Sequence, residues 1–273
     1  MSIGNIEEEY RFNYIWHGDR TQPIILFLHG FMGDCRDFEA VINHLPEFCC
    51  LTVDLPGHGL TEVERDSRYQ MANTARGLIQ LLRELEIDSC ILVGYSMGGR
   101  IALYLTINFP HFFRGTVLES ASPGLATQSA RDRRIDWDLQ LSERLTTSDL
   151  TSFLASWYAN PLFDSFRNHP RYQAAITRRL QNNPARLAKS LQNIGLGRQP
   201  SLWGRLAAID RSLLLIVGDK DYKFTEIAQK MLCSLPDASL SVVQNSGHNV
   251  HFEQPREFSQ LLKDFILDCQ PKM

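Results

Sequence analysis

The chain has 273 residues, of which 44% are hydrophobic and 22% are charged, and its 28 basic and 31 acidic side chains leave a net charge of −3. This length fits one large domain or two small ones, and such a chain can bury enough surface to fold without a metal or a disulfide. The near-neutral charge excludes a global nucleic-acid footprint, and the composition excludes collagenous and disordered chains.

The sequence predicts a cytoplasmic protein without membrane insertion. Its first ten residues lack the basic start and apolar stretch of a secretory signal, and no apolar run approaches the roughly 18 residues of a membrane helix. The six cysteines form neither a C-x-x-C pair nor a Cys/His zinc pattern. We therefore expect reduced thiols, no metal and no nucleic-acid partner.

Short apolar runs alternate with helical patterns along most of the chain. Continuous apolar runs, rather than alternating ones, indicate strands that are covered on both faces of a parallel sheet. The spacing of leucines and other apolar residues predicts helices over residues 69–86, 98–108 and 258–269. The predicted strands are residues 23–29, 49–54, 89–94, 115–119, 212–217 and 239–244. This alternation predicts an α/β fold with a mostly parallel sheet and helices on both faces.

The alternation breaks over residues 124–204, which look helical and contain no convincing strand. We predict a helical lid there, inserted into a core made of residues 1–123 and 205–273. Between residues 124 and 200 there are 11 basic and six acidic residues, so this stretch carries +5 and the remainder −8. Ten of the 11 basic residues are arginines, whose planar guanidinium suits carboxylate and phosphate. We expect two or three of them to face an anionic ligand.

The sharpest motif is the G-x-S-x-G of residues 94–98, which follows a predicted strand and opens a predicted helix. This is the context of a nucleophile elbow, in which a tight turn lifts the Ser96 hydroxyl clear of the sheet. Positive partial charge at the start of the following helix lies beneath it.

A serine at its ordinary pKa needs a base, and the base needs an orienting acid. His248 follows the last predicted strand, and Asp221 follows the strand before it. The chain order Ser96, Asp221, His248 is that of α/β-hydrolases. Asp219 is the alternative acid, and we expect His251 to flank the site.

Two backbone N–H groups are expected to form an oxyanion hole. One belongs to Met97, directly after the serine, and the other to Phe31 in the loop after the first long strand. His29 and His58 are interpreted as residues whose hydrogen bonds hold loops in place.

These motifs occur in the order of the α/β-hydrolase fold, which the chain resembles over its whole length. That fold hosts many activities and does not settle function. Ser96 argues against the haloalkane dehalogenases and epoxide hydrolases of the fold, which place an aspartate there.

A narrower resemblance within the fold rests on segments of both core and lid. These are residues 28–34, 94–104, 120–125, 157–163, 179–183, 195–200, 218–224 and 246–251. In these segments the chain resembles the 2-succinyl-6-hydroxy-2,4-cyclohexadiene-1-carboxylate synthases of menaquinone and phylloquinone biosynthesis.

The resemblance implies a cofactor-free carbon–oxygen lyase that eliminates pyruvate from 2-succinyl-5-enolpyruvyl-6-hydroxy-3-cyclohexene-1-carboxylate. Ser96, polarised by His248, would act as a base that abstracts a ring proton, with Asp221 orienting the imidazolium. The partner is then a small polycarboxylate. By resemblance, the residues that bind its carboxylates are Arg100, Arg134 and Arg179, and those that line its pocket are Tyr95 and Trp157. Arg131 and Arg133 are close enough in the sequence to be alternatives to Arg134, and Arg198 is a further candidate from its motif alone.

Two alternatives remain open. The first is a carboxylesterase or C–C bond hydrolase with Ser96 as a covalent nucleophile, which would form an acyl-enzyme. The second is a non-catalytic receptor of the same fold, in which Ser96→Ala would leave function intact.

Overall fold

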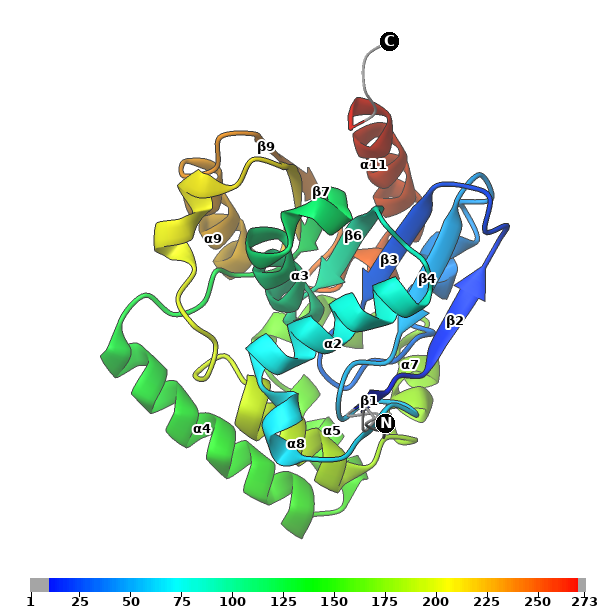
Figure 1. Cartoon of the computed structure of the whole chain (residues 1–273). Helices are drawn as coiled ribbons and strands as arrows, with labels where there is room; N and C mark the ends of the chain where they lie inside the picture. The colour runs from blue at the N-terminus through cyan, green and yellow to red at the C-terminus, as the bar shows by residue number, and fades with distance from the viewer. Residues whose placement is uncertain (1–9, 270–273) are drawn as a thin grey trace, which may run out of the picture.

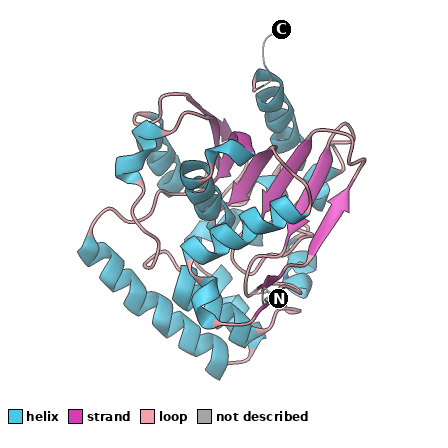
Figure 2. Ribbon diagram, viewed as in Figure 1, coloured by secondary structure: helices cyan, strands magenta, loops and turns pink. Residues whose placement is uncertain are grey.

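A seven-stranded sheet forms the centre of the computed structural model, which describes residues 10–269. Figure 1 shows it above a group of helices, and Figure 2 shows helices on both of its faces. The strand order is β2-β4-β3-β6-β7-β8-β9. The bounds are β2 (Tyr14–His17), β3 (Ile24–Leu28), β4 (Cys49–Val53), β6 (Cys90–Tyr95), β7 (Phe113–Glu119), β8 (Ser212–Gly218) and β9 (Ala238–Val243).

All six strands predicted from the sequence are present and pair in parallel, which confirms the mostly parallel sheet. In the seven-stranded sheet, the one strand that the sequence did not predict is β2, which pairs antiparallel with β4 at the edge. Its residues are partly exposed, so it lacks the continuous apolar run that marks the central strands. A separate small ladder joins β1 (Tyr10–Arg11) to β5 (Glu62–Val63).

Each face of the sheet has its own apolar core. Leu26 and Leu28 of β3 point into one core, and the alternating residues Ile25 and Phe27 point into the other. The helices that cover the first face are α2 (Met71–Glu84), α3 (Met97–Asn108) and α9 (Tyr222–Leu232). Those that cover the second face are α1 (Glu39–Ile42), α10 (Val250–Glu253) and α11 (Pro255–Asp268).

Between β7 and β8 the chain leaves the sheet and forms a group of helices in the segment predicted as a lid, and this segment is called the lid below. Its helices are α4 (Gln128–Thr147), α5 (Leu150–Tyr158), α6 (Asp164–Arg167), α7 (Tyr172–Arg179) and α8 (Pro184–Ile194). Short 3₁₀ turns complete the chain: η1 (Asp66–Tyr69), η2 (Pro110–Phe112), η3 (Pro161–Phe163) and η4 (Trp203–Ala208). In Figure 1, α4, α5 and α8 lie together on one side of the molecule.

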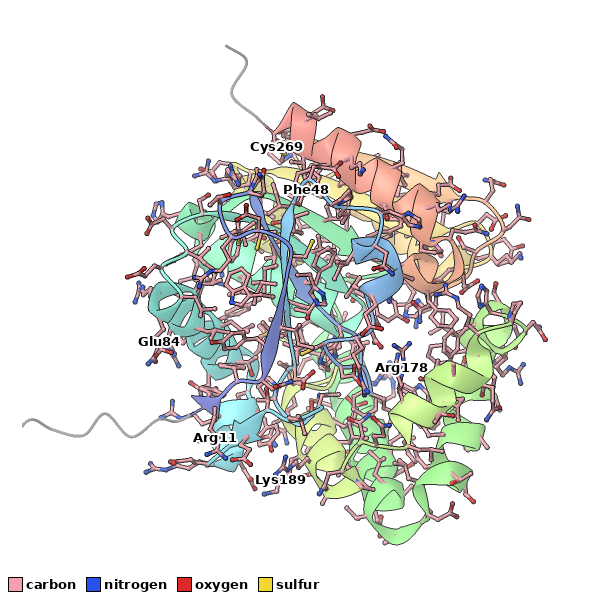
Figure 3. The ribbon with its side chains drawn as sticks, turned by 90° about the vertical axis from the view of Figure 1, so that its right-hand side faces the viewer. Arg11, Phe48, Glu84, Arg178, Lys189 and Cys269 are labelled. Carbon is pink, nitrogen blue, oxygen red and sulfur yellow. The ribbon has the colours of Figure 1, made fainter. Side chains whose placement is uncertain are left out.

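The lid has its own apolar core, which includes Leu141, Phe153 and Leu187, and Met32 of the main body also packs into it. Two salt bridges tie its surface to the rest of the molecule. Lys189 of α8 pairs with Asp66 at 2.7 Å, and Arg178 of α7 pairs with Glu39 at 3.7 Å. Figure 3 labels Lys189 and Arg178 on the lid side of these contacts. The lid is therefore packed onto the core and bonded to it.

Within residues 10–269, none of the helices combines the length and the apolar character needed to cross a membrane. All six cysteines lie in this range, and none of them is in a disulfide. In the same range, no three His, Cys, Asp or Glu side chains gather in a way that could hold a metal ion.

Candidate active site

Ser96 lies at a sharp turn between β6 and α3. Its backbone has φ 49° and ψ −103°, a conformation that costs a non-glycine residue energy and is typical of a nucleophile elbow. The flanking glycines allow this turn because neighbouring backbone fills their side-chain space. A Cβ on Gly94 would lie 2.5 Å from the Gly98 carbonyl oxygen, and one on Gly98 would lie 2.1 Å from that of Leu28. This turn places Ser96 on the wall of a cavity.

The structure brings Ser96, His248 and Asp221, the three residues predicted to carry the chemistry, together in one hydrogen-bonded chain. Ser96 Oγ lies 3.1 Å from His248 Nε2, and His248 Nδ1 lies 2.6 Å from Asp221 Oδ2. The His248 and Asp221 side chains are 3% and 1% exposed, so this short contact is shielded from water. The rings of Phe224 and Phe163 pack on the imidazole, with centroids 4.5 and 5.9 Å away. The arrangement can remove a proton from, or deliver one to, a molecule beside Ser96.

Asp219, the alternative acid, has a different role in the fold. Its carboxylate accepts the backbone N–H of Ser246 at 3.0 Å, and so holds the loop that leads to His248. His251 also lies apart from the hydrogen-bonded chain. Its backbone N–H and its Nδ1 both contact the buried carboxylate of Glu119, at 3.0 and 2.7 Å.

A cavity of about 760 Å³ opens above Ser96, a volume that suits a small molecule. Among the described residues, its charged lining consists of five cations and the single carboxylate of Asp221. Such a lining favours a ligand with several negative charges. The five cations are Arg100, Arg134, Arg144, Lys220 and Lys223. Two of them, Arg134 and Arg144, belong to the lid, which agrees with the expectation that two or three lid arginines face the site, and the other three belong to the core.

Arg100 lies one helical turn after Ser96 on α3 and lines the cavity. Its Nη1 donates to the Ile194 carbonyl oxygen at 2.9 Å and to Gln199 Oε1 at 3.1 Å, and both acceptors are neutral. Burial and the nearby positive charge of Arg134 lower the pKa of Arg100 to about 10. The guanidinium is still charged at neutral pH, so an anion in the cavity would gain from pairing with it.

Two further cations line the cavity near Arg100. Arg134 of α4 holds its Nε 2.7 Å from Asp138 Oδ1, which orients the guanidinium. Lys223 stands two residues after Asp221, and burial and Arg134 lower its pKa. Lys223, Lys220 and Arg144 were not predicted from the sequence as residues of the site, although all three line the cavity. Lys220 and Lys223 could have been found from their place beside the acid at the end of a predicted strand.

Arg179 requires a correction, because it was expected to bind a substrate carboxylate and does not line the cavity. Its two terminal nitrogens donate to Asp37 Oδ1 and Oδ2 at 2.6 and 2.9 Å. Both side chains are buried, at 5% and 2% exposure. Burial disfavours the cation, but Asp37 and Tyr158 more than offset it, so the pKa of Arg179 lies above its ordinary value.

Tyr95 also lies outside the cavity lining. It is buried under the histidine loop, with its ring 4.8 Å from that of His251, and burial raises its pKa. Trp157 does line the cavity, as expected. The further candidates lie elsewhere: Arg131 donates to the Leu125 carbonyl oxygen, Arg133 donates to Ser129 on its own helix, and Arg198 lines a different hollow.

The two predicted oxyanion donors, Phe31 and Met97, line the same cavity as Ser96. His29 has a loop-holding role: its Nε2 accepts the Leu55 N–H at 2.9 Å, and its Nδ1 lies 2.7 Å from the Gly30 carbonyl oxygen. His58 Nδ1 lies 3.2 Å from the Pro56 carbonyl oxygen, so it too contacts its own loop.

Glu253 is a functional candidate that the sequence analysis missed. Its Oε2 accepts the Gly247 N–H at 2.9 Å and also the hydroxyl of Ser165, which belongs to lid helix α6. It therefore joins the lid to the residue before His248. Its signal in the sequence is weak, because an acidic residue five positions after the histidine has no special pattern.

The fold and the site geometry indicate a class of protein, and comparison with known proteins places the chain in the same class. The model of the α/β hydrolase fold family matches residues 23–255, so the chain is an α/β-hydrolase-fold protein with a Ser–His–Asp site. This confirms the predicted fold class.

The relatives narrow the family. The chain is 34% identical over 265 residues to the putative 2-succinyl-6-hydroxy-2,4-cyclohexadiene-1-carboxylate synthase of Bacillus subtilis, and the match covers 96% of each chain. It is 33% identical to the Arabidopsis thaliana protein PHYLLO, chloroplastic, over 89% of this chain and 15% of that much longer protein. The solved structure of MenH from S. aureus superposes with a TM-score of 0.90 at 31% identity, covering 94% of this chain and 99% of that one.

The chain belongs to the 2-succinyl-6-hydroxy-2,4-cyclohexadiene-1-carboxylate synthase family, a family of lyases in menaquinone and phylloquinone biosynthesis.

Proposed function

We propose that this chain eliminates pyruvate from 2-succinyl-5-enolpyruvyl-6-hydroxy-3-cyclohexene-1-carboxylate and uses Ser96, His248 and Asp221 to move the proton. Family membership supports the reaction. The observation that carries the proposal for this chain is the cavity above Ser96, whose charged lining is five cations and one carboxylate. A substrate with a ring carboxylate, an enolpyruvyl carboxylate and a succinyl carboxylate matches that lining.

The chemistry follows from the change in the ring. The substrate has its double bond at ring position 3 and the product has double bonds at positions 2 and 4, so a proton leaves C2 and the enolpyruvyl oxygen leaves C5. The proton at C2 is acidic because it is adjacent to the succinyl ketone. Ser96 Oγ, 3.1 Å from His248 Nε2, takes this proton and passes its own to the imidazole. Asp221, 2.6 Å from Nδ1, stabilises the imidazolium that forms.

The electron pair from the C2–H bond moves onto the ketone oxygen as an enolate. In this proposal the N–H groups of Phe31 and Met97, two residues that line the cavity, stabilise this oxygen. The enolate then collapses, the ring double bond shifts, and the C5–O bond breaks with its electron pair, so that pyruvate leaves as its enolate. The imidazolium of His248 gives its proton to this enolate, directly or through Ser96, and the resulting enol becomes pyruvate. Every atom and electron pair is accounted for without a cofactor.

Arg100 and Arg134 are the cations we propose for the substrate carboxylates. Arg100 stands one turn from Ser96 and has only neutral hydrogen-bond acceptors. Arg134 has one edge on Asp138, which leaves its terminal nitrogens for a ligand. Trp157 supplies an apolar wall against the ring.

The test is release of pyruvate from freshly prepared substrate by the purified protein without added cofactor. Asp221→Asn should lower kcat by about 10⁴-fold, the usual effect of giving the histidine a wrong orienting partner. Asp219→Asn is the matched control, two residues away and outside the hydrogen-bonded chain. Its amide oxygen can still accept the Ser246 N–H that holds the loop, so it should retain most activity.

Absence of pyruvate release by the wild type contradicts the proposal. A covalent acyl-enzyme on Ser96, trapped with an activated ester that the protein turns over faster than this substrate, would instead favour the hydrolase alternative.

A further inference from the structure

We infer that lid residues Arg179 and Asn182 are positioning residues that hold the His29–Gly33 loop, and with it the proposed oxyanion donor Phe31, in its active shape. The inference rests on the proposed function, because it concerns the loop that would stabilise the enolate. It assigns a role to a segment of the lid, residues 179–182, that does not line the cavity.

The first contact is indirect and runs through Asp37. Arg179 binds both carboxylate oxygens of Asp37 in a buried pair. The same carboxylate packs against Gly33, since a Cβ there would lie 2.3 Å from Asp37 Oδ2. It would also lie 2.9 Å from the Gly30 carbonyl oxygen and 2.9 Å from His29 Nδ1. The end of the loop is therefore enclosed between its own residues and the carboxylate that Arg179 holds.

The second contact is direct. Asn182 donates its side-chain amide to the Met32 carbonyl oxygen at 3.0 Å and to the Arg179 carbonyl oxygen at 3.1 Å. Asn182 is 8% exposed, so water does not readily replace the bond to Met32. Met32 needs this support, because its backbone is in the left-handed region with φ 65°.

A third lid contact fixes the Phe31 side chain. Its ring lies 5.3 Å from that of Trp157 on α5. One loop of five residues thus receives a ring, an amide and, through Asp37, a guanidinium from three separate points of the lid. A shift of about 1 Å in a group that stabilises transition-state charge can cost about 10²-fold in rate. This makes the contacts relevant to catalysis as well as to folding.

A positioning role and a substrate-binding role give opposite kinetics. If Arg179 acts through Asp37, then Arg179→Ala and Asp37→Ala should each lower kcat by about 10- to 100-fold and leave KM within about threefold. The double variant should be no worse than either single one, since both break the same contact. If Arg179 binds substrate, Arg179→Ala raises KM, Asp37→Ala does not reproduce the effect, and the two changes add. That second pattern overturns the inference.

Two further variants keep the test valid if a buried unpaired charge prevents Arg179→Ala or Asp37→Ala from folding. Asn182→Ala removes the direct contact without leaving a charge, and the Arg179→Met/Asp37→Leu double variant replaces the pair by apolar groups. Hydrogen–deuterium exchange of the peptide that covers residues 29–33 should rise in Asn182→Ala. It should not rise in Arg167→Ala, the matched control, which breaks the exposed lid pair with Asp164.

Exchange at residues 29–33 that is unchanged in Asn182→Ala overturns the inference. The exchange result does not depend on the reaction, so the two proposals fail separately. A wild type that releases no pyruvate removes the proposed function and leaves the loop contacts to be judged by exchange alone.

Discussion

The wall of the cavity and the anchored side of the lid use arginine in opposite ways. On the anchored side, Arg179 has both terminal nitrogens on the buried carboxylate of Asp37. On the cavity side, Arg100 of the core has a backbone carbonyl and a side-chain amide as its acceptors, and burial together with the nearby guanidinium of Arg134 lowers its pKa. Breaking a buried pair of cation and carboxylate destabilises the fold, whereas a buried cation without a carboxylate partner is a place for an anionic ligand. Predictions that separate these two kinds of arginine follow, from the largest expected effect to the smallest.

Removal of Arg179 should give the largest loss of stability. Arg179→Ala leaves Asp37 buried and unpaired, which typically costs about 3–5 kcal/mol of the free energy of unfolding. Arg100→Ala leaves no unpaired carboxylate, so its stability should stay within about 1 kcal/mol of wild type. Urea unfolding of the two variants measures both numbers. Equal losses would remove the distinction between the two sides.

The sequence could not make this distinction. Arg100 and Arg179 were both selected by resemblance, and nothing in the local sequence of Arg179 reveals its pairing with Asp37, 142 positions away. The lid charge of +5 favoured a few lid arginines at the site, and Arg134 and Arg144 line the cavity. It gave no indication of the three cavity cations that belong to the core. Helix α4 has no pronounced apolar face, so the side of it that meets the cavity depends on packing against α8 and α5.

The sequence did predict the elements whose signals are local. The six predicted strands are continuous apolar runs. The turn at Ser96 needs glycine at positions 94 and 98, where a Cβ would meet backbone atoms, so it leaves a recognisable G-x-S-x-G motif. Asp221 and His248 could be placed because the ends of parallel strands meet at one edge of the sheet, so chain order translates into proximity. Glu253 and Ser165 have no such signal, because their contact depends on how the lid docks.

Removal of Arg100 should affect catalysis most among the cavity cations. Arg100→Ala should lower kcat/KM by an amount worth about 2–5 kcal/mol, the usual cost of losing one partner of a desolvated charge pair. Arg205→Ala is a control of the same type, because Arg205 is exposed and bonds only Asn108 on the core surface. Pyruvate release under steady-state conditions measures both. A loss in Arg100→Ala no larger than in Arg205→Ala would argue against a ligand carboxylate at Arg100.

Acid should lower the free energy of unfolding through Asp34, whose carbonyl oxygen accepts the backbone N–H of Asp37 at 3.0 Å. Burial alone would raise the pKa of Asp34, but hydrogen bonds from the Arg36 side chain and backbone more than offset it and lower the pKa to about 2. A carboxyl group with a lowered pKa stabilises the fold above its unfolded value near 3.8, and this contribution is lost as the pH falls from there towards 2. The shift corresponds to about 2 kcal/mol at neutral pH.

Asp34→Asn should therefore be about 2 kcal/mol less stable than wild type at pH 7, and the difference should shrink below about pH 4. Urea unfolding at pH 7, 5 and 3 measures this difference. A difference that stays constant across the series would show that the loss comes from packing rather than from the carboxylate charge.

The smallest expected effect concerns Arg134, whose side chain is 30% exposed and already shares one edge with Asp138. Because water and Asp138 both reduce the gain from a ligand, Arg134→Gln should raise KM by only about tenfold, or about 1.4 kcal/mol. Arg133→Gln removes the same charge one position away on α4, where the side chain bonds only Ser129. It should leave KM within about twofold.

A KM effect that is equal in Arg133→Gln and Arg134→Gln, and that disappears at high salt, would mean that α4 acts by long-range attraction of the anion. A larger effect in Arg134→Gln that persists at high salt indicates a direct contact. The lid would then use neighbouring arginines on one helix for two purposes, with the direction of each side chain deciding which.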